Sequence, residues 1–74
     1  MAEGFIHTVY AHGAWLNKIE GGAQLSAQYV TKAAAISGGR AEAIRREMEH
    51  VIHNQDGTIR ERNSYGDDPG DSSG

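Results

Sequence analysis

The sequence predicts a small α+β domain in which one helix packs on a single antiparallel sheet, with the element order ββαββ. Three observations support this fold class. β-rich runs flank His12-Gly13, a second pair of runs flanks Asp56-Gly57, and an alanine-rich stretch without proline lies between them. Because hairpins join neighbouring antiparallel strands, we expect four strands in one sheet and the helix on one of its faces.

The first hairpin is expected in the segment 5–22, where Gly13 can supply the positive φ of a two-residue turn. This turn sets three opposing pairs of large side chains: Tyr10 with Trp15, Val9 with Leu16, and Ile6 with Ile19. Both faces of the hairpin are then partly apolar. Either face can be the core face, and the other is a candidate interface if nothing in the chain covers it.

After Gly21-Gly22, the segment 23–30 is expected to be a connection or a short third strand. Thr31 has the side chain of a helix N-cap, and the segment 32–47 is rich in Ala, Arg and Glu. At 100° per residue, one stripe of the helix carries small and apolar residues: Ala33, Ile36, Gly39 and Ala43. We expect Gly39 to let the helix approach the sheet closely.

The second hairpin is expected in the segment 50–62, because Asp56-Gly57 lies between two short runs with β-branched residues. A four-residue loop, 54–57, would place Ile52 directly opposite Ile59. We therefore expect this longer loop rather than a two-residue turn.

Length and composition limit the function. The chain has 74 residues, no cysteine and a formal net charge of −3. The lack of cysteine excludes disulfides, thiolate zinc sites and a cysteine nucleophile, and the acidic balance argues against nucleic acid as a partner. The N-terminal segment has neither the basic start of a signal peptide nor an apolar run that could cross a membrane. We expect a cytoplasmic protein that does not contact membranes.

Four histidines raise the question of a metal site. His50 and His53 are three residues apart, so on a strand they point to opposite faces and cannot chelate one ion together. His7 can meet one of them only across neighbouring strands, with no acid placed to complete the set. The sequence therefore predicts no metal ligands and no cofactor.

Catalytic residues are also not expected. The paired acids Glu47 and Glu49 need a concave, desolvated site to act in acid-base catalysis, and a chain of this size offers little room for one. No serine lies in a GxSxG context. We expect no enzymatic activity and no small-molecule substrate.

The stretch "RERNSYGDDP" near the end of the chain holds the residues that resemble a site. Asn63 and Ser64 suit a turn and Gly66 can end it, so that Tyr65 folds back as a structural tether formed by residues 63–66. Alternatively, a partner-binding clasp is built from Arg60, Arg62, Asn63 and Tyr65. Residues 1–66 are expected to form the single domain, and residues 67–74 a disordered acidic tail.

The segments "IHTVYAHGAWLN" and "AEAIRREMEHVIHNQDGTIRERNSYGDDP" resemble the small bacterial family catalogued as domain of unknown function 2188. The resemblance covers about residues 6–69 and is most specific in the closing DGxIxxxNSYGxDP pattern. Asn17 departs from it, since it stands where members carry an apolar strand residue. The resemblance implies a bacterial cytosolic protein and no assigned activity.

These observations predict a non-enzymatic module that binds an unknown protein partner or a second copy of itself, as in a homodimer, through an uncovered sheet face. The alternative is a nucleic-acid-binding module in which Arg60 and Arg62 flank a stacking platform of the sheet aromatics Tyr10 and Trp15. Cross-strand aromatic pairs are also ordinary sheet stabilisers, which favours the first hypothesis.

Overall fold

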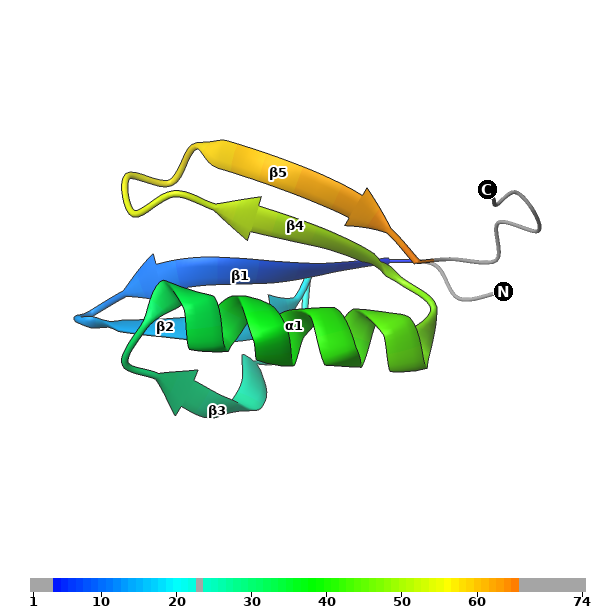
Figure 1. Cartoon of the computed structure of the whole chain (residues 1–74), viewed down its shortest axis with the longest axis horizontal. Helices are drawn as coiled ribbons and strands as arrows, with labels where there is room; N and C mark the ends of the chain where they lie inside the picture. Colours follow the sequence, from blue (N-terminus) through cyan, green and yellow to red (C-terminus); the bar gives the residue numbers. More distant parts are fainter. Residues whose placement is uncertain (1–3, 23, 66–74) are drawn as a thin grey trace.

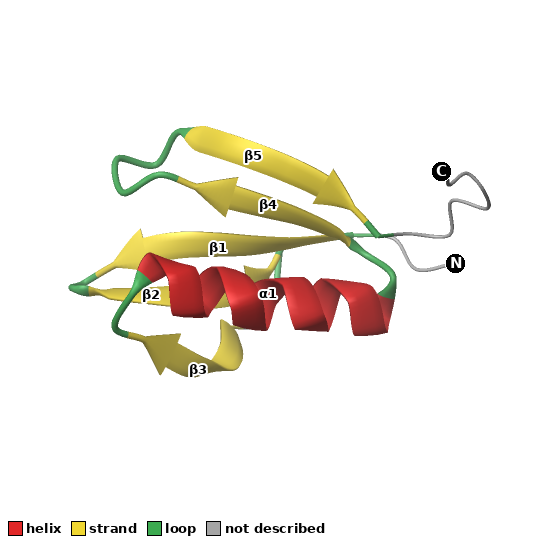
Figure 2. Ribbon diagram, viewed as in Figure 1, coloured by secondary structure: helices red, strands yellow, loops and turns green. Residues whose placement is uncertain are grey.

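The structure, a computed structural model, describes residues 4–22 and 24–65. It contains the strands β1 (Phe5–Ala11), β2 (Ala14–Ile19), β3 (Gln24–Tyr29), β4 (Glu49–His53) and β5 (Ile59–Ser64), and the helix α1 (Lys32–Arg46). The strands form one sheet in the order β3-β2-β1-β4-β5. Helix α1 lies across one face of this sheet (Figures 1 and 2). Gly66 and the predicted acidic tail, residues 67–74, lie outside the described residues.

The α+β class is confirmed, but two details of the predicted sheet are wrong. Segment 24–29 is a strand, so the order is βββαββ. The sheet is mixed, because β1 and β4 pair in parallel while the other three strand pairs are antiparallel. The two errors have one cause. With only two strands before the helix, β4 would run antiparallel to β1. The third strand, β3, reverses the direction of the chain before the helix, so that β4 runs parallel to β1.

The first hairpin has the predicted turn and register. Its turn residues His12 and Gly13 have φ of 51° and 84°, and positive φ at both positions is what a type I′ turn needs. The three predicted pairs, Tyr10 with Trp15, Val9 with Leu16 and Ile6 with Ile19, are all present. The turn chemistry therefore set the register of β1 and β2.

Helix α1 begins as predicted. The Thr31 side chain accepts a hydrogen bond from the N–H of Ala34 over 3.1 Å. Glu47 ends the helix in the left-handed conformation, with φ of 59°. The predicted buried stripe is partly wrong, because Ala35 is buried and Ala33 is exposed. The buried line therefore runs through Ala35, Gly39 and Ala43.

The second hairpin differs from the prediction at its loop. Thr58 joins the loop because its N–H and hydroxyl both donate to Asp56, which lowers the pKa of that carboxyl. The loop is thus one residue longer than predicted. Ile52 lies opposite Glu61, while Ile59 lies opposite His53 and is 59% exposed. The expected pairing of the two isoleucines is wrong.

A buried polar cluster lies between α1 and the central strands. Thr8 donates to the Asn17 side-chain oxygen over 2.5 Å, and Asn17 donates to the Ala35 carbonyl over 3.0 Å. The same Thr8 oxygen lies 2.6 Å from His50 Nε2. Gly39 covers these three side chains: a Cβ at this position would lie 2.5 Å from Asn17 Oδ1, 2.6 Å from His50 Nε2 and 2.8 Å from Thr8 Oγ1. The expectation that Gly39 permits close helix packing is confirmed.

The hydrogen bonds of this cluster assign the protonated nitrogen of His50. Thr8 gives its one hydroxyl proton to Asn17, so it can only accept from His50, and Nε2 of His50 carries a proton. Burial lowers the pKa of His50, with opposing electrostatic contributions from Glu61 and Arg40. His50 is therefore a neutral core residue that donates one hydrogen bond.

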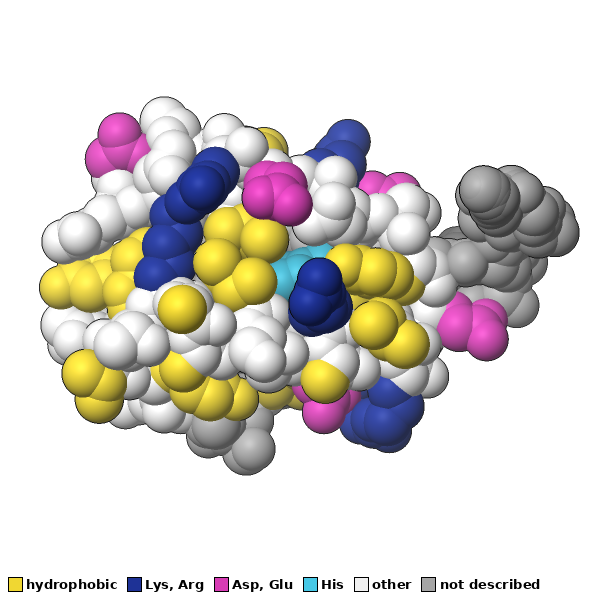
Figure 3. Space-filling model, viewed as in Figure 1, with side chains coloured by type: hydrophobic (Ala, Val, Ile, Leu, Met, Phe, Trp, Pro, Cys, Tyr) yellow, Lys and Arg dark blue, Asp and Glu magenta, His cyan; other side chains and the backbone are white. Residues whose placement is uncertain are grey.

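Among the residues that the structure describes, the helix side shows no concentration of one charge. Figure 3 shows basic, acidic and apolar side chains interspersed over this face. Part of the charge is paired within α1, where Glu42 contacts both Arg45 and Arg46 over 2.7 and 2.8 Å. Within residues 4–22 and 24–65, this side therefore lacks the basic patch that is typical of a nucleic-acid interface.

Candidate binding surface on the open face of the sheet

The open face is the side of the sheet opposite α1. Thr8, Asn17 and His50 point toward the helix, so their neighbours along each strand point away from it. By strand alternation and register, the open face carries Phe5, His7, Val9, Leu16, Lys18, Glu49, Val51, His53, Ile59 and Arg62. Within residues 4–22 and 24–65, no second layer covers it (Figure 2).

The burial of the open face divides it into a packed centre and an accessible margin. Leu16 and Val51 are buried by their neighbours, with exposures of 8% and 1%. Phe5 and Val9 are half-buried, and Lys18 is exposed. The accessible part of the face therefore combines aromatic, aliphatic and charged side chains.

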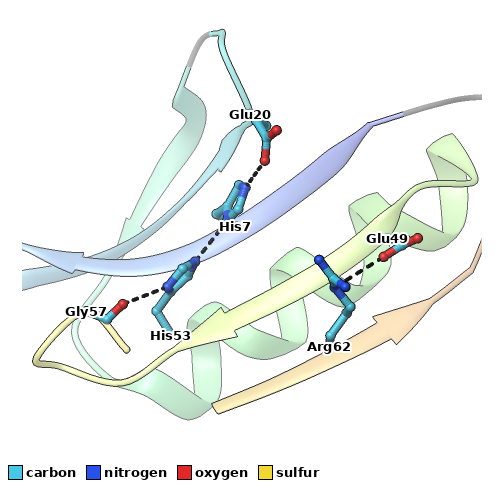
Figure 4. A network of polar contacts seen from close by, with 6 residues as sticks. All are labelled: His7, Glu20, Glu49, His53, Gly57 and Arg62. Carbon is cyan, nitrogen blue, oxygen red and sulfur yellow. Dashed lines mark hydrogen bonds and ion pairs between the residues drawn. The ribbon is translucent and has the colours of Figure 1, made fainter. Parts of the chain in front are cut away.

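Four groups form a continuous chain of hydrogen bonds across the open face (Figure 4). Nε2 of His7 lies 2.7 Å from the Glu20 carboxylate, and Nδ1 of His7 lies 2.8 Å from Nε2 of His53. Nδ1 of His53 lies 3.1 Å from the Gly57 carbonyl oxygen. The parallel pairing of β1 with β4 brings the two histidines together, and the turn after β2 supplies Glu20.

Arg62 lies over the same face on the other side of Val51. Its guanidinium is 5.5 Å from the centre of the Phe5 ring, and its Nε is 3.4 Å from the Glu49 carboxylate (Figure 4). Val51 pairs with His7 on one side and with Arg62 on the other. Arg62 therefore covers apolar surface with its side chain as well as pairing with an acid.

The predicted clasp residues do not converge. Arg62 lies on the open face, whereas Asn63 is paired in register with the helix-facing His50 and donates to Glu61. Arg60 has no partner in the β4–β5 register. The four residues thus do not form one cluster, because neighbours on a strand alternate between faces.

The turn predicted at Asn63 and Ser64 is wrong, because both residues lie in β5 and pair with β4. The N–H of Tyr65 donates to the Met48 carbonyl over 3.2 Å, and Tyr65 is half-buried. Ser64 is exposed and pairs with Glu49 at the end of β5. Tyr65 therefore attaches the end of β5 to the residue that precedes β4.

The predicted aromatic platform is not assembled. Tyr10 and Trp15 pack edge to face with ring centres 5.1 Å apart, but on the helix side of the sheet. Trp15 is only 7% exposed, and Lys32 from α1 lies 5.4 Å from its ring centre. Arg62 is on the opposite face, so these aromatic rings and this arginine cannot contact one ligand together.

Sequence reasoning foresaw that His7 could meet another histidine only across neighbouring strands, and it did separate His50 from His53. It missed Glu20, because the predicted register ended at Ile19. It left open which histidine His7 meets, because it did not predict that β1 and β4 are neighbours that pair in parallel. The parallel pairing of His7 with Val51 places His7 within reach of His53, and the sequence pattern does not contain this pairing.

The fold and this surface define a small α+β protein with a mixed five-stranded sheet, helix-covered on one face and open on the other within the described residues. Residues 6–65 match the model of the family described as "Uncharacterized protein conserved in bacteria (DUF2188)", and the chain belongs to this family. No curated protein and no solved structure matches it. No helix in residues 4–22 and 24–65 is long and apolar enough to cross a membrane.

Proposed function

We propose that this chain is a non-enzymatic protein-interaction module of the bacterial cytoplasm and that the open face is its contact surface. The observation that carries the proposal is the composition of this face. It combines the half-buried Phe5 and Val9 with the exposed Arg62 and Lys18. Interfaces between proteins are enriched in aromatic residues and arginine, with an apolar centre and a polar rim.

The acids singled out as catalytic candidates are accounted for by structural contacts, which supports a non-enzymatic role. Glu49 pairs with Arg62 on the surface of the sheet. Glu47 is exposed and terminates α1 in the left-handed conformation. Neither carboxyl occupies the desolvated position that acid-base catalysis requires.

A protein partner fits this surface better than a nucleic acid does. The net charge of −3 opposes binding to phosphate, Arg62 is already paired with Glu49, and Trp15 is buried beneath α1. We expect no binding to generic DNA or RNA at physiological salt. Submicromolar binding that weakens steeply as salt is added would contradict the proposal.

The test compares equivalent changes on the two sides of the molecule. Val9→Lys and Lys18→Glu alter the open face, and Ile44→Lys is the matched control on α1, where Ile44 is 52% exposed. Sedimentation of each intact variant at tens of micromolar measures self-association, and capture from a bacterial lysate measures binding to other proteins. Circular dichroism verifies folding.

We expect the two open-face variants to lose association while Ile44→Lys keeps it. Lys18→Glu protects the test against a folding defect in Val9→Lys, because Lys18 is exposed. Association that survives both open-face changes, or that is lost only in the helix variant, would place the contact surface elsewhere.

A further inference from the structure

We propose that His7 and His53 form a proton-binding site that holds one proton between their rings, with Glu20 as the neutralising anion. The nitrogens that face each other, His7 Nδ1 and His53 Nε2, are 2.8 Å apart. The proposal concerns the state of the free chain, so it does not depend on the proposed partner.

The outer nitrogens of the pair are assigned by their acceptors. A carboxylate accepts hydrogen bonds and cannot donate, so Nε2 of His7 carries a proton toward Glu20, 2.7 Å away. The Gly57 carbonyl likewise only accepts, so Nδ1 of His53 carries a proton. A neutral imidazole has one N–H, and in each ring these contacts already use it.

The inner nitrogens therefore need a third proton. With both rings neutral, His7 Nδ1 and His53 Nε2 would present lone pairs to each other at hydrogen-bond distance, which is repulsive. One added proton converts this contact into a charge-assisted N–H···N bond. The ring centres are 5.1 Å apart, so the rings meet end to end, as a nearly linear hydrogen bond requires.

The charges around the pair favour one added proton and oppose a second. Glu20 contacts His7 directly and can balance a single positive charge. Lys18 lies opposite His7 in the β1–β2 register, which adds positive potential. Asp56, in the loop that supplies Gly57, carries a further negative charge.

Part of the more distant charge is paired. Glu49 and Arg62 share the open face but are paired with each other. His50, on the opposite face, is neutral, and its pKa is lowered in part by His7. Arg60, next to Ile59 on β5, carries one further positive charge. Glu20 is therefore the neighbour whose removal should act most strongly.

Nitrogen-15 NMR of the histidine rings in the intact chain, with a chelator present, tests the proposal across the pH range of histidine titration. In the singly protonated pair we expect protons on His7 Nε2 and His53 Nδ1 and one shared proton between the rings. On further increase in pH, both rings should lose that proton in a single common step. His12, which is exposed in the first turn, is the internal reference.

Glu20→Gln removes the anion at an exposed position and should move the common step to lower pH. Glu49→Gln is the matched control, since it removes an acid of the same face that contacts Arg62 instead of a histidine. Separate titration of His7 and His53 would overturn the proposal. A common step that Glu20→Gln and Glu49→Gln shift equally would overturn the assignment of Glu20.

Discussion

Replacement of Gly39 by alanine tests whether the buried polar cluster depends on the missing side chain. An alanine Cβ would lie within 3 Å of Asn17 Oδ1, His50 Nε2 and Thr8 Oγ1, each closer than ordinary van der Waals contact allows. None of these atoms is free to move away, because they bond one another and Asn17 also holds the Ala35 carbonyl. The helix must move outward or the cluster must break.

The size of the effect follows from opposing contributions. Alanine in the middle of a helix is favoured over glycine by about 1 kcal/mol. Overpacking a core costs about 1–3 kcal/mol, and a buried polar group left without its partner costs about 1–3 kcal/mol more. We therefore expect Gly39→Ala to lower the free energy of unfolding by about 1–5 kcal/mol. For a domain of this size, each kcal/mol lowers Tm by roughly 4–8 °C.

Gly38→Ala is the matched control, because it makes the same change one position earlier. A Cβ at Gly38 would meet the hydroxyl end of Tyr29, which is the far end of a flexible side chain on the edge strand β3. Urea and thermal unfolding of both variants give the comparison. If Gly39→Ala is as stable as the parent chain, or no less stable than Gly38→Ala, the cluster is not tightly packed against the helix.

Three further predictions concern the remaining contacts. Thr31→Ala removes the helix N-cap and should cost about 1 kcal/mol in urea unfolding; no loss would mean that another group caps the helix. Tyr65→Ala should cost about 1–2 kcal/mol, less than a fully buried ring, because Tyr65 is half-buried; an unchanged Tm would refute the tether. Burial lowers the pKa of His50 in the folded chain, so the unfolded chain takes up a proton first as pH falls below about 6.5. Stability should therefore be lost on acidification, and His50→Gln should show a shallower loss between about pH 7 and 5; equal slopes would contradict the role of His50.

Local sequence signals predicted the elements whose geometry is set by neighbouring residues. Gly13 specified the first turn and its register, and Thr31 specified the start of α1. The N-cap and the two-residue turn are decided by a few consecutive residues, so the sequence alone contains them. The β4–β5 register was mispredicted because Thr58 donates hydrogen bonds to the Asp56 side chain and so belongs to the loop. The pattern of apolar residues in the strands does not reveal this loop length.

Features that depend on long-range pairing were not predictable in the same way. Segment 24–29 has two glutamines and weak alternation, and its status as a strand decides the direction of every later element. The parallel β1–β4 pairing and the His7–His53 contact both follow from that single decision. The resemblance to the bacterial family identified the chain correctly, but its shared motif residues alone do not give this topology.

The central position of β1 has a consequence for how the chain folds during synthesis. Strands β1, β2 and β3 are consecutive and can pair as soon as they emerge, but the second edge of β1 is completed only by β4, after the whole of α1. Until then the nascent meander presents an unpaired edge, open to other chains. Closing this non-local contact brings together segments more than forty residues apart, since His7 meets His53 across 46 positions. We therefore expect β1–β4 pairing to be the late, rate-limiting step of folding, and the step most sensitive to crowding by other nascent chains.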